Sequence, residues 1–423
     1  MNVSKNTPAG QGNLAVSTTL SPITDMAKPA WSQSFLGQAS KSLLKTLRSL
    51  APTSNVLGNT PTSTIVALHK KHTTSYITPP LSFEKASETL QESSGGGQVY
   101  LSRHLRTNKT YVVKHTEPAP PSERSHPPTE SYVIESILKP HPNIIYHNET
   151  IHDSSNPGRH YIVLEYCSGG DLFNQLSYWW LTRKTHVPTL FLLHTVVELF
   201  DAFAYIHHGL RHVGGGKYTR DKGHRPVIHN DTKGENIFLK NSTDAIGGLP
   251  SLILADFGHA RVVGETLYET GAGTPNYFSP EDQEIIQQAR EAGKLEKDED
   301  ICEVYYSVSR NRTTAADIYS LGHVLYIMAA NSGFNRERIS RWPIGKDPLK
   351  LKISPEYLAV DGLLEIVQKC LIPDVGKRAS ADFDPKTGVL PLVHQLRQVR
   401  DEMIRKGERL PRAEWLQPPS ESS

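Results

Sequence analysis

Residues 227–238 read VIHNDTKGENIF and place four reactive side chains between two apolar pairs. The four are His229, Asp231, Lys233 and Asn236. Apolar pairs at both ends indicate buried, strand-like segments, and a rigid scaffold commonly carries its reactive groups on a loop between such segments. A solvated turn could have the same composition, so the neighbouring motifs have to decide between the two interpretations.

A second motif follows closely along the chain. Residues 252–260 read LILADFGHA, an apolar strand that ends at Asp256, Phe257 and Gly258. Together the two stretches resemble the catalytic loop H-R-D-x-x-x-x-N and the D-F-G triplet of eukaryotic-type protein kinases. The resemblance implies a bilobal α+β fold, with a small antiparallel β lobe that carries one main helix and a larger, mainly helical lobe.

Further motifs occur in the order that the family requires. Residues 271–281, GAGTPNYFSPE, end in a triplet close to A-P-E, and the resemblance pairs Glu281 with Arg378. Residues 316–329, ADIYSLGHVLYIMA, resemble the helix that carries Asp317 beneath the catalytic loop. The joint order and spacing favour a kinase domain over a chance match.

Two charged residues upstream complete the expected phosphate site. Residues 110–115, TYVVKH, place Lys114 at the end of an alternating strand, as in the family's V-A-I-K. We expect Glu130 to be its partner, because apolar residues four and seven positions later put Glu130 at the edge of a buried helix face. Glu135 is the alternative partner.

The resemblance implies phosphoryl transfer from ATP and assigns a role to each motif residue. Lys114 would hold the α- and β-phosphates, while Asp256 and Asn236 would supply the oxygen ligands that Mg²⁺ prefers. Asp231 would accept the proton of the attacking hydroxyl. Lys233 marks serine/threonine rather than tyrosine kinases and would stabilise the γ-phosphate. The implied substrates are therefore Ser and Thr hydroxyls of proteins.

Residues 160–172, HYIVLEYCSGGDL, resemble the hinge between the two lobes, where adenine binds. The resemblance gives four of them to the nucleotide. These are Leu164 as gatekeeper, Glu165 and Cys167 through their backbone, and Asp171 near the ribose.

The glycine-rich loop departs from the family pattern. Residues 92–100, ESSGGGQVY, stand where the family has G-x-G-x-x-G-x-V, and alignment on Val99 keeps only Gly97. Gly95 and Gly96 would still let the backbone approach phosphates, but a triple-glycine run costs more entropy to order. The eroded loop leaves open a second interpretation, a pseudokinase that uses the fold as an interaction module with little turnover.

Asn230 is the second departure from the family. It stands where many kinases have an arginine that grips a phosphate on the activation loop, which by spacing would be on Thr270. A neutral amide forms a weaker hydrogen bond than a charged group does. We therefore expect a loop ordered mainly by its own packing, with Arg261 or His259 as a partial phosphate pocket.

Composition narrows the class and location of the protein. The chain of 423 residues has 46 Lys and Arg against 44 Asp and Glu, a net charge of +2, so no broad nucleic-acid surface is expected. Cys167, Cys302 and Cys370 show neither disulfide nor metal spacing, which favours a reducing compartment. The pattern predicts no transmembrane segment and an intracellular protein, cytoplasmic or nuclear.

The chain divides into three parts by composition. Residues 1–80 contain 23 Ser or Thr, seven Lys or Arg and a single acid, which predicts a mostly disordered tail. The kinase resemblance covers residues 83–403, with a small lobe at 83–164 and a large lobe at 168–403. Residues 404–423 would form a C-terminal tail.

Two insertions distinguish the chain within the family. Residues 207–227 lengthen the approach to the catalytic loop, as in some NIMA-related kinases, which several other motifs weakly resemble. Residues 282–314 form a charged, helical-looking insert beside the expected site for a protein substrate. The insert could dock a substrate or partner, or it could be solvated.

Overall fold

The fold is that of a computed structural model. Its described residues are 83–92, 98–116, 128–153, 156, 159–241, 246–265, 271–330, 351, 353–411 and 414–416. Several predicted features lie outside them, namely the tail of residues 1–80, the glycines Gly95, Gly96 and Gly97, and Thr270.

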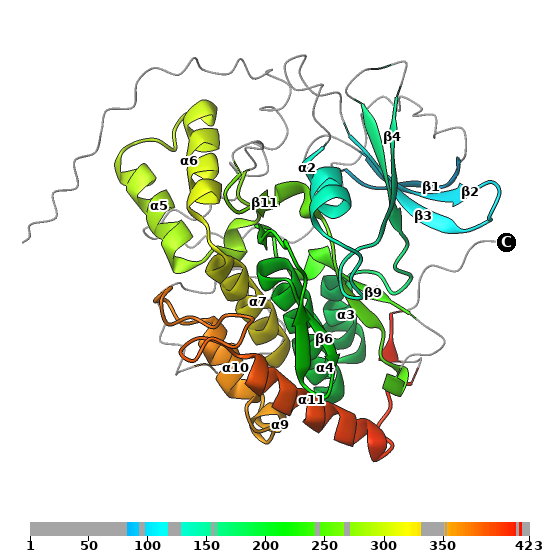
Figure 1. The fold of residues 1–423 in the computed structure, drawn as a ribbon, viewed down its shortest axis with the longest axis vertical. Coiled ribbons are helices and arrows are strands. Elements are labelled where there is room, and N and C mark those ends of the chain that lie inside the picture. The colour runs from blue at the N-terminus through cyan, green and yellow to red at the C-terminus, as the bar shows by residue number, and fades with distance from the viewer. Residues whose placement is uncertain are drawn as a thin grey trace, which may run out of the picture.

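The small lobe is a five-stranded antiparallel sheet with the strand order β1-β2-β3-β5-β4 (Figure 1). Its strands are β1 (Phe83–Glu92), β2 (Gln98–His104), β3 (Thr110–His115), β4 (His147–His152) and β5 (His160–Glu165). One face buries an aromatic and aliphatic cluster of Phe83, Tyr100, Val113, Tyr161 and Val163. The alternating pattern of β3 therefore forms a strand with one buried face, as the sequence predicts.

One short helix packs beside the sheet. It begins as α2 (Thr129–Ser131) and continues as a wider π-helical turn, Tyr132–Ile137, in which the Leu138 N–H bonds the Val133 carbonyl five residues back. π-helical turns are uncommon and often occur near functional sites. Val133 and Ile134 are buried on the same side as Glu130.

The large lobe is built around α4 (Thr189–His208), which is buried along most of its length. The helices around it are α3 (Leu172–Ser177), α7 (Thr314–Ala329), α9 (Pro355–Leu358), α10 (Leu363–Cys370) and α11 (Leu390–Arg405). α11 and α7 both pack on α4, and α10 packs on α7 (Figure 1). The two lobes together confirm the predicted bilobal α+β fold.

Helix α4 is long and apolar enough to cross a membrane by length and composition alone. However, 89% of its most apolar 18-residue window is buried inside the protein, as in the core helix of a globular domain.

Short two-stranded sheets in the described part of the large lobe hold the motif loops. They pair β8 (Val227–Ile228) with β11 (Arg261–Val262), and β9 (Ile237–Lys240) with β10 (Ser251–Leu254). The apolar pairs at both ends of the stretch at 227–238 thus begin or form strands. The catalytic loop and the D-F-G turn are fixed relative to each other because their flanking strands are paired.

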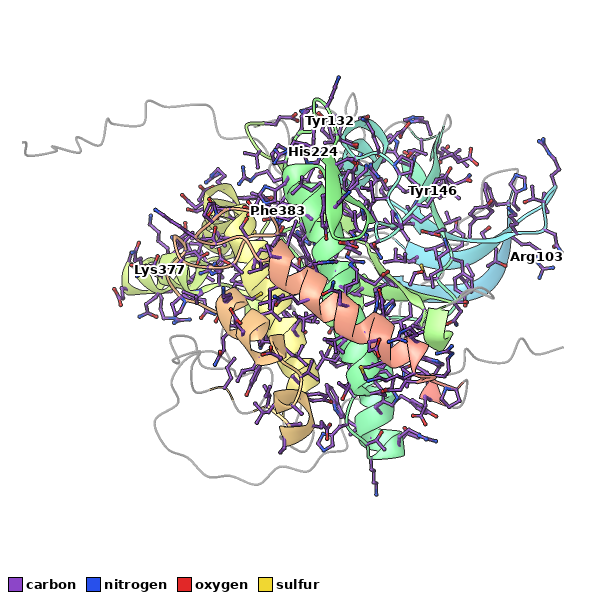
Figure 2. The ribbon with its side chains drawn as sticks, turned by 60° about the horizontal axis from the view of Figure 1, so that its bottom comes forward. Arg103, Tyr132, Tyr146, His224, Lys377 and Phe383 are labelled. Carbon is purple, nitrogen blue, oxygen red and sulfur yellow. The ribbon has the colours of Figure 1, made fainter. Side chains whose placement is uncertain are left out.

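The insertion at residues 207–227 forms a hairpin of β6 (Leu210–Gly214) and β7 (Lys217–Arg220). The hydroxyl of Tyr218 donates to Asp201 on α4 at 2.7 Å. The Tyr218 ring also meets Phe383 edge-on, with the ring centroids 5.5 Å apart. Phe383 lies on the large lobe (Figure 2). The hairpin is therefore docked on the large lobe.

The insert at residues 282–314 packs on one side into an apolar cluster and has exposed residues, such as those at 291–294, on its surface. It contains most of α5 (Pro280–Glu291) and all of α6 (Asp298–Asn311), which lie side by side (Figure 1). The two helices enclose an apolar cluster with two residues of the preceding segment. The cluster comprises Ala272, Phe278, Ile286, Ala289, Ile301, Val304, Tyr305 and Val308.

The chain beyond residue 403 also contacts the large lobe. The Trp415 ring lies 5.5 Å from Trp179 and 5.2 Å from Phe191, centroid to centroid. The side chain of Gln175 bonds the backbone on both sides of Trp415, at the Glu414 carbonyl (3.1 Å) and the Leu416 N–H (2.8 Å). Trp415 thus belongs to the hydrophobic core.

We expect Trp415→Ala to lower the free energy of unfolding by about 3 kcal/mol, because it removes a large buried aromatic group. Denaturant titration followed by far-UV circular dichroism measures the change. Leu181→Ala, at an exposed apolar residue nearby, is the control and should shift stability by less than about 0.5 kcal/mol. A Trp415→Ala variant as stable as the wild type would show that this contact contributes little.

Candidate active site

Lys114 lies between two carboxylates from different elements. Its Nζ is 2.7 Å from Oε2 of Glu130 and 2.7 Å from Oδ1 of Asp256. Glu130 is 3% exposed, whereas the Glu135 side chain is 57% exposed and lies 3.9 Å from His147. The structure therefore brings Glu130, and not Glu135, to Lys114.

Lys114 and Asp256 stabilise each other's charged form. Burial would lower the pKa of Lys114, but the Asp256 and Glu130 carboxylates outweigh it and raise that pKa. Burial likewise would raise the pKa of Asp256, and the Lys114 ammonium outweighs it and lowers that pKa. Burial raises the pKa of Glu130 despite the opposing effect of Lys114. Lys114 is thus cationic and Asp256 anionic at neutral pH.

One buried carboxylate, that of Asp317, binds the backbone of the catalytic loop. Asp317 on α7 accepts the backbone N–H of His229 at 2.7 Å and that of Asn230 at 3.0 Å. Nε2 of His207 contacts the same carboxylate at 3.0 Å. Burial would raise the pKa of Asp317, but the hydrogen bond and charge of His207 outweigh it and lower that pKa. The position of the loop is therefore set by helix α7, as the resemblance predicted.

His229 links the catalytic loop to the D-F-G turn. Its side chain is buried, Nε2 lies 2.9 Å from the Ala255 carbonyl, and its ring meets Phe257 edge-on at 4.8 Å. Burial lowers its pKa, so the ring is neutral. A buried neutral histidine that contacts a carbonyl and an aromatic ring is a structural residue rather than a proton shuttle.

Asp231 is the centre of a second cluster. Its Oδ2 is 2.7 Å from Nζ of Lys233 and accepts from the Asn236 amide at 2.9 Å. Its Oδ1 accepts from both the backbone N–H (2.7 Å) and the hydroxyl (2.8 Å) of Thr274. Burial would raise the pKa of Asp231, but Lys233 outweighs it and the pKa is lowered. The group is therefore an ionised carboxylate, as a proton acceptor must be.

Thr274 is a site residue that the sequence reasoning missed. Besides bonding Asp231, its hydroxyl accepts from Nζ of Lys233 at 2.8 Å. The available sequence signal was its place just before the segment PNYFSPE. Thr274 thus connects Asp231 to the segment at residues 275–281.

The donor set fits Mg²⁺. The Asn236 side-chain nitrogen donates to the backbone and carboxylate oxygens of Asp231, so its side-chain oxygen is the atom that would bind a metal, with a carboxylate oxygen of Asp256 as the second donor. In the described part of the chain, no group of three or more His, Cys, Asp or Glu could enclose a metal. Two hard oxygen donors suit Mg²⁺, which usually completes its shell with waters and phosphate oxygens.

The hinge residues lie where the resemblance puts them, at the end of β5 and just beyond. Leu164 and Cys167 are buried, and burial raises the pKa of the Cys167 thiol to about 12, so this thiol is neutral. The Glu165 carboxylate lies 2.5 Å from Nζ of Lys240. Asp171 caps α3 by accepting the Asn174 N–H at 2.8 Å.

Val99 on β2 pairs in register with Lys114 on β3. It therefore lies near the strand end beside Lys114, which is the place predicted for it. The glycines that precede it are outside the described residues.

The side chain of Asn230 bonds a backbone carbonyl just after the D-F-G turn. The residue is buried with a left-handed backbone (φ 67°), which asparagine tolerates better than most residues. Its side-chain nitrogen donates to the His259 carbonyl at 2.8 Å. The Arg261 guanidinium donates to the Arg312 carbonyl at 2.6 Å, and the His259 ring contacts the Gly271 carbonyl at 2.9 Å. The polar groups predicted as a phosphate pocket are thus engaged with backbone carbonyls.

The predicted pair of Glu281 and Arg378 is present, with two N–O contacts of 2.7 Å. Arg378 is fully buried and also donates to three backbone carbonyls, those of Ala315, Ile372 and Pro373. This bidentate pair fixes the start of α5 against the large lobe.

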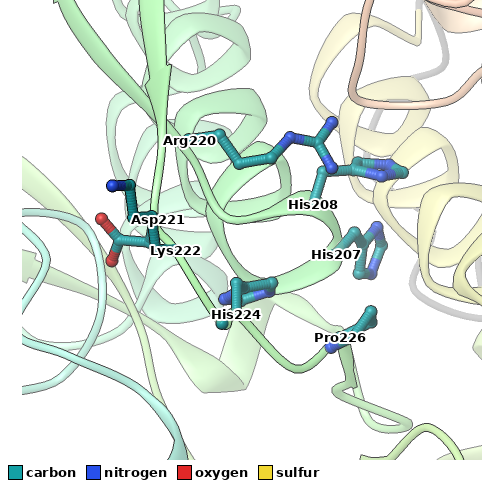
Figure 3. Close-up of a pocket in the computed structure, with 8 residues that line it drawn as sticks. His207, His208, Arg220, Asp221, Lys222, His224 and Pro226 are labelled. Carbon is teal, nitrogen blue, oxygen red and sulfur yellow. The ribbon is translucent and has the colours of Figure 1, made fainter.

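A cavity of about 450 Å³ lies at the end of α4, between His207, Arg220 and His224 (Figure 3). It contains no residue of the Lys114 or Asp231 clusters. One of its lining residues, His207, contacts Asp317, which binds the backbone of the catalytic loop. This cavity is therefore distinct from the expected nucleotide site.

Gly273 packs directly against the catalytic loop. A Cβ atom there would lie 2.3 Å from Oδ1 of Asp231 and 2.6 Å from the Asn230 carbonyl oxygen. Distances this short cannot be accommodated without moving the loop, so the position requires glycine.

We expect Gly273→Ala to destabilise the protein by about 1 to 3 kcal/mol, the usual cost of overpacking. Gly271→Ala is the matched control, because a Cβ atom at Gly271 meets nothing within 4 Å. Thermal unfolding of the two variants tests the contact. Equal melting temperatures for both would contradict the close approach of Gly273 to the catalytic loop.

Comparison with known proteins agrees with this geometry. Mouse serine/threonine-protein kinase Nek1 is 29% identical over 233 residues, which cover 54% of this chain and 15% of Nek1. Human Nek5 is 30% identical over 234 residues, 54% of this chain and 25% of Nek5. Myosin light chain kinase A of Dictyostelium discoideum is 29% identical over 204 residues, 47% of this chain and 59% of that kinase. The match thus spans less than two thirds of each relative.

The family model described as "Protein kinase domain" matches residues 93–383, which is more than half of the chain. That range includes Lys114, the catalytic loop, the D-F-G turn and the buried Arg378. The protein therefore belongs to the protein kinase domain family.

Proposed function

We propose that this chain is an ATP- and Mg²⁺-dependent protein kinase that transfers the γ-phosphate of ATP to Ser or Thr hydroxyls of proteins. The observation that carries the proposal is the Asp231 cluster. An ionised carboxylate, the Lys233 ammonium and the Thr274 hydroxyl contact one another at 2.7 to 2.8 Å. This arrangement pairs a proton acceptor with a cation that can stabilise phosphate charge.

The chemistry follows from the residues in place. Asp231 accepts the hydroxyl proton as the substrate oxygen forms its bond to the γ-phosphorus, and the bond from that phosphorus to the bridging oxygen breaks to release ADP. Lys114, oriented by Glu130, binds the α- and β-phosphates. Mg²⁺ held by Asp256 and Asn236 would neutralise charge on the phosphates.

The pseudokinase alternative receives no support. A pseudokinase would be expected to lack one or more of the groups that transfer phosphate. Here Lys114 and Asp256 are paired, and Asp231 is ionised beside Lys233. The most similar curated relatives considered above are named as kinases.

An intracellular location, cytoplasmic or nuclear, remains part of the proposal. The three cysteines support it as thiols, with Cys167 and Cys370 buried and Cys302 partly exposed. Docking of a partner on the insert at 282–314 also stays a prediction.

The decisive test is transfer of the γ-phosphate from ATP to the protein itself and to a generic basic protein, with and without Mg²⁺. We expect Asp256→Asn to reduce transfer by about 1,000-fold or more, equivalent to about 4 kcal/mol of barrier, because it removes the charged Mg²⁺ ligand. Glu135→Gln, at the exposed helix glutamate, is the control. Wild-type turnover by Asp256→Asn would refute the assignment.

Lys114→Met should abolish transfer as well, and it should also destabilise the protein. The substitution leaves the buried Glu130 carboxylate without its partner, and breaking a buried pair costs about 3 to 5 kcal/mol. Denaturant titration measures this loss of stability beside the activity. Asp256→Asn should lose activity with less loss of stability, because Asp256 is partly exposed and asparagine has the same shape as aspartate. Unchanged stability of Lys114→Met would show that the buried pair is weak.

A further inference from the structure

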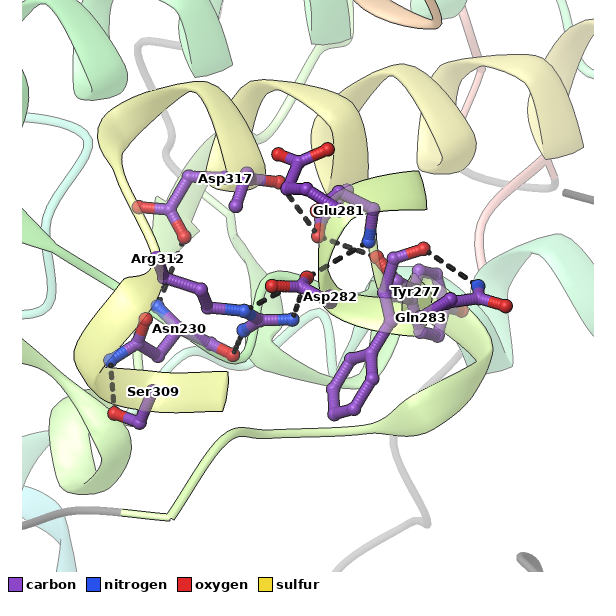
Figure 4. A network of polar contacts seen from close by, with 12 residues as sticks. Asn230, Tyr277, Glu281, Asp282, Gln283, Ser309, Arg312 and Asp317 are labelled. Carbon is purple, nitrogen blue, oxygen red and sulfur yellow. Dashed lines mark hydrogen bonds and ion pairs between the residues drawn. The ribbon is translucent and has the colours of Figure 1, made fainter. Parts of the chain in front are cut away.

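A buried arginine joins the insert to the catalytic loop. Arg312, just after α6, has a side chain that is 2% exposed. Its Nε and Nη2 donate to Oδ2 of Asp282 at 3.0 and 2.9 Å, and Nη1 donates to the backbone carbonyl of Asn230 (Figure 4). The guanidinium also lies over the Phe278 ring, 4.6 Å from its centroid.

The anion that Arg312 meets is itself rigidly held. Asp282 is buried, and its Oδ2 also accepts the backbone N–H of Ser279 at 2.9 Å, closing the cap of helix α5. A guanidinium buried this deeply is tolerated only when it is fully paired. The pair of Arg312 and Asp282 therefore has one geometry, set by the start of α5.

The Asn230 carbonyl that Arg312 binds is also part of the contact between the catalytic loop and the segment at Gly273 and Thr274. The Asn230 oxygen also accepts the Gly273 N–H at 3.2 Å, and the next N–H, that of Thr274, bonds Oδ1 of Asp231 at 2.7 Å. Arg312 thus fixes the point at which Gly273 and Thr274 meet the catalytic loop.

Packing of helix α6 fixes the position of Arg312. α6 packs through Val304, Tyr305 and Val308 into the apolar cluster that includes Ala272 and Phe278. Packing therefore delivers Arg312 to the Asn230 carbonyl, while the Asn230 amide donates to the His259 carbonyl and to Oγ of Ser309 on α6.

We infer that Arg312 is a positioning residue for phosphoryl transfer. It clamps the Asn230 carbonyl so that Gly273 and Thr274 stay aligned with Asp231. The carboxylate of Asp282 supplies the anion for this clamp permanently, so the alignment needs no added phosphate. The activity arms of the test rest on the proposed kinase function, whereas the hydrogen-exchange arm does not.

The experiment uses the full chain and compares Arg312→Met with Arg310→Met. Arg310 is the matched control, since it lies two residues earlier and pairs with Glu303 at the surface. In Arg312→Met we expect amide exchange at Gly273 and Thr274 to speed up about tenfold and kcat to fall about tenfold or more. The KM for ATP should stay within about twofold, because the Lys114 cluster is not touched. Arg310→Met should resemble the wild type.

A further pair of variants separates positioning from plain stabilisation. Arg312→Met combined with Asp282→Asn leaves no unpaired buried charge and keeps a side-chain acceptor at the α5 cap. If Arg312 only stabilised the insert, this double variant would recover turnover. We expect turnover to stay low, because the Asn230 carbonyl still lacks its donor. Arg312→Lys should recover turnover in part, since one ammonium cannot form the same fork.

Several results would overturn the inference. They are unchanged exchange at Gly273 and Thr274 in Arg312→Met, full recovery in the double variant, or a loss of ATP affinity that parallels the loss of turnover. A roughly tenfold drop in wild-type activity on phosphatase treatment would also do so, because the clamp would then depend on a phosphate. If the wild type transfers no phosphate at all, the proposed function fails, and the exchange measurement alone still decides the clamp.

Discussion

The position of the Asp317 carboxylate is the constraint on which the active site depends. This buried group accepts two backbone N–H groups of the catalytic loop, from His229 and Asn230, and contacts His207 on α4. A buried carboxylate is costly unless hydrogen bonds compensate its lost hydration, and here three do. Because the two amides immediately precede Asp231, the core helices α4 and α7 set the direction of the proton acceptor.

The site contains two clusters, each of which pairs a lysine with at least one carboxylate. In one, Lys114 is held between the Glu130 and Asp256 carboxylates, and in the other Asp231 is held by Lys233. Ion pairing keeps Lys114, Asp256 and Asp231 charged in spite of burial, which would otherwise neutralise them. Groups that are fixed and charged before a substrate arrives need little reorganisation during phosphoryl transfer.

The insert at 282–314 also contacts the active site. Its helices α5 and α6 form an apolar cluster with Ala272 and Phe278, which belong to the segment after the D-F-G turn. That packing lets an arginine far along the chain, Arg312, reach the catalytic loop. The buried pair of Arg312 and Asp282 then gives this part of the site a single geometry, in the way that buried polar groups can specify structure.

The sequence by itself determined the family, the bilobal fold and the residues of the motifs, because those depend on residue types at short, fixed spacings. Strand periodicity placed Lys114 at a strand end, and the resemblance to the kinase family placed Asp317 on a helix. Only the tertiary structure decided which glutamate meets Lys114, that Thr274 bonds Asp231, and that Arg312 binds the Asn230 carbonyl. These contacts join residues that are distant in the chain, and packing of whole helices brings them together, which no local pattern records.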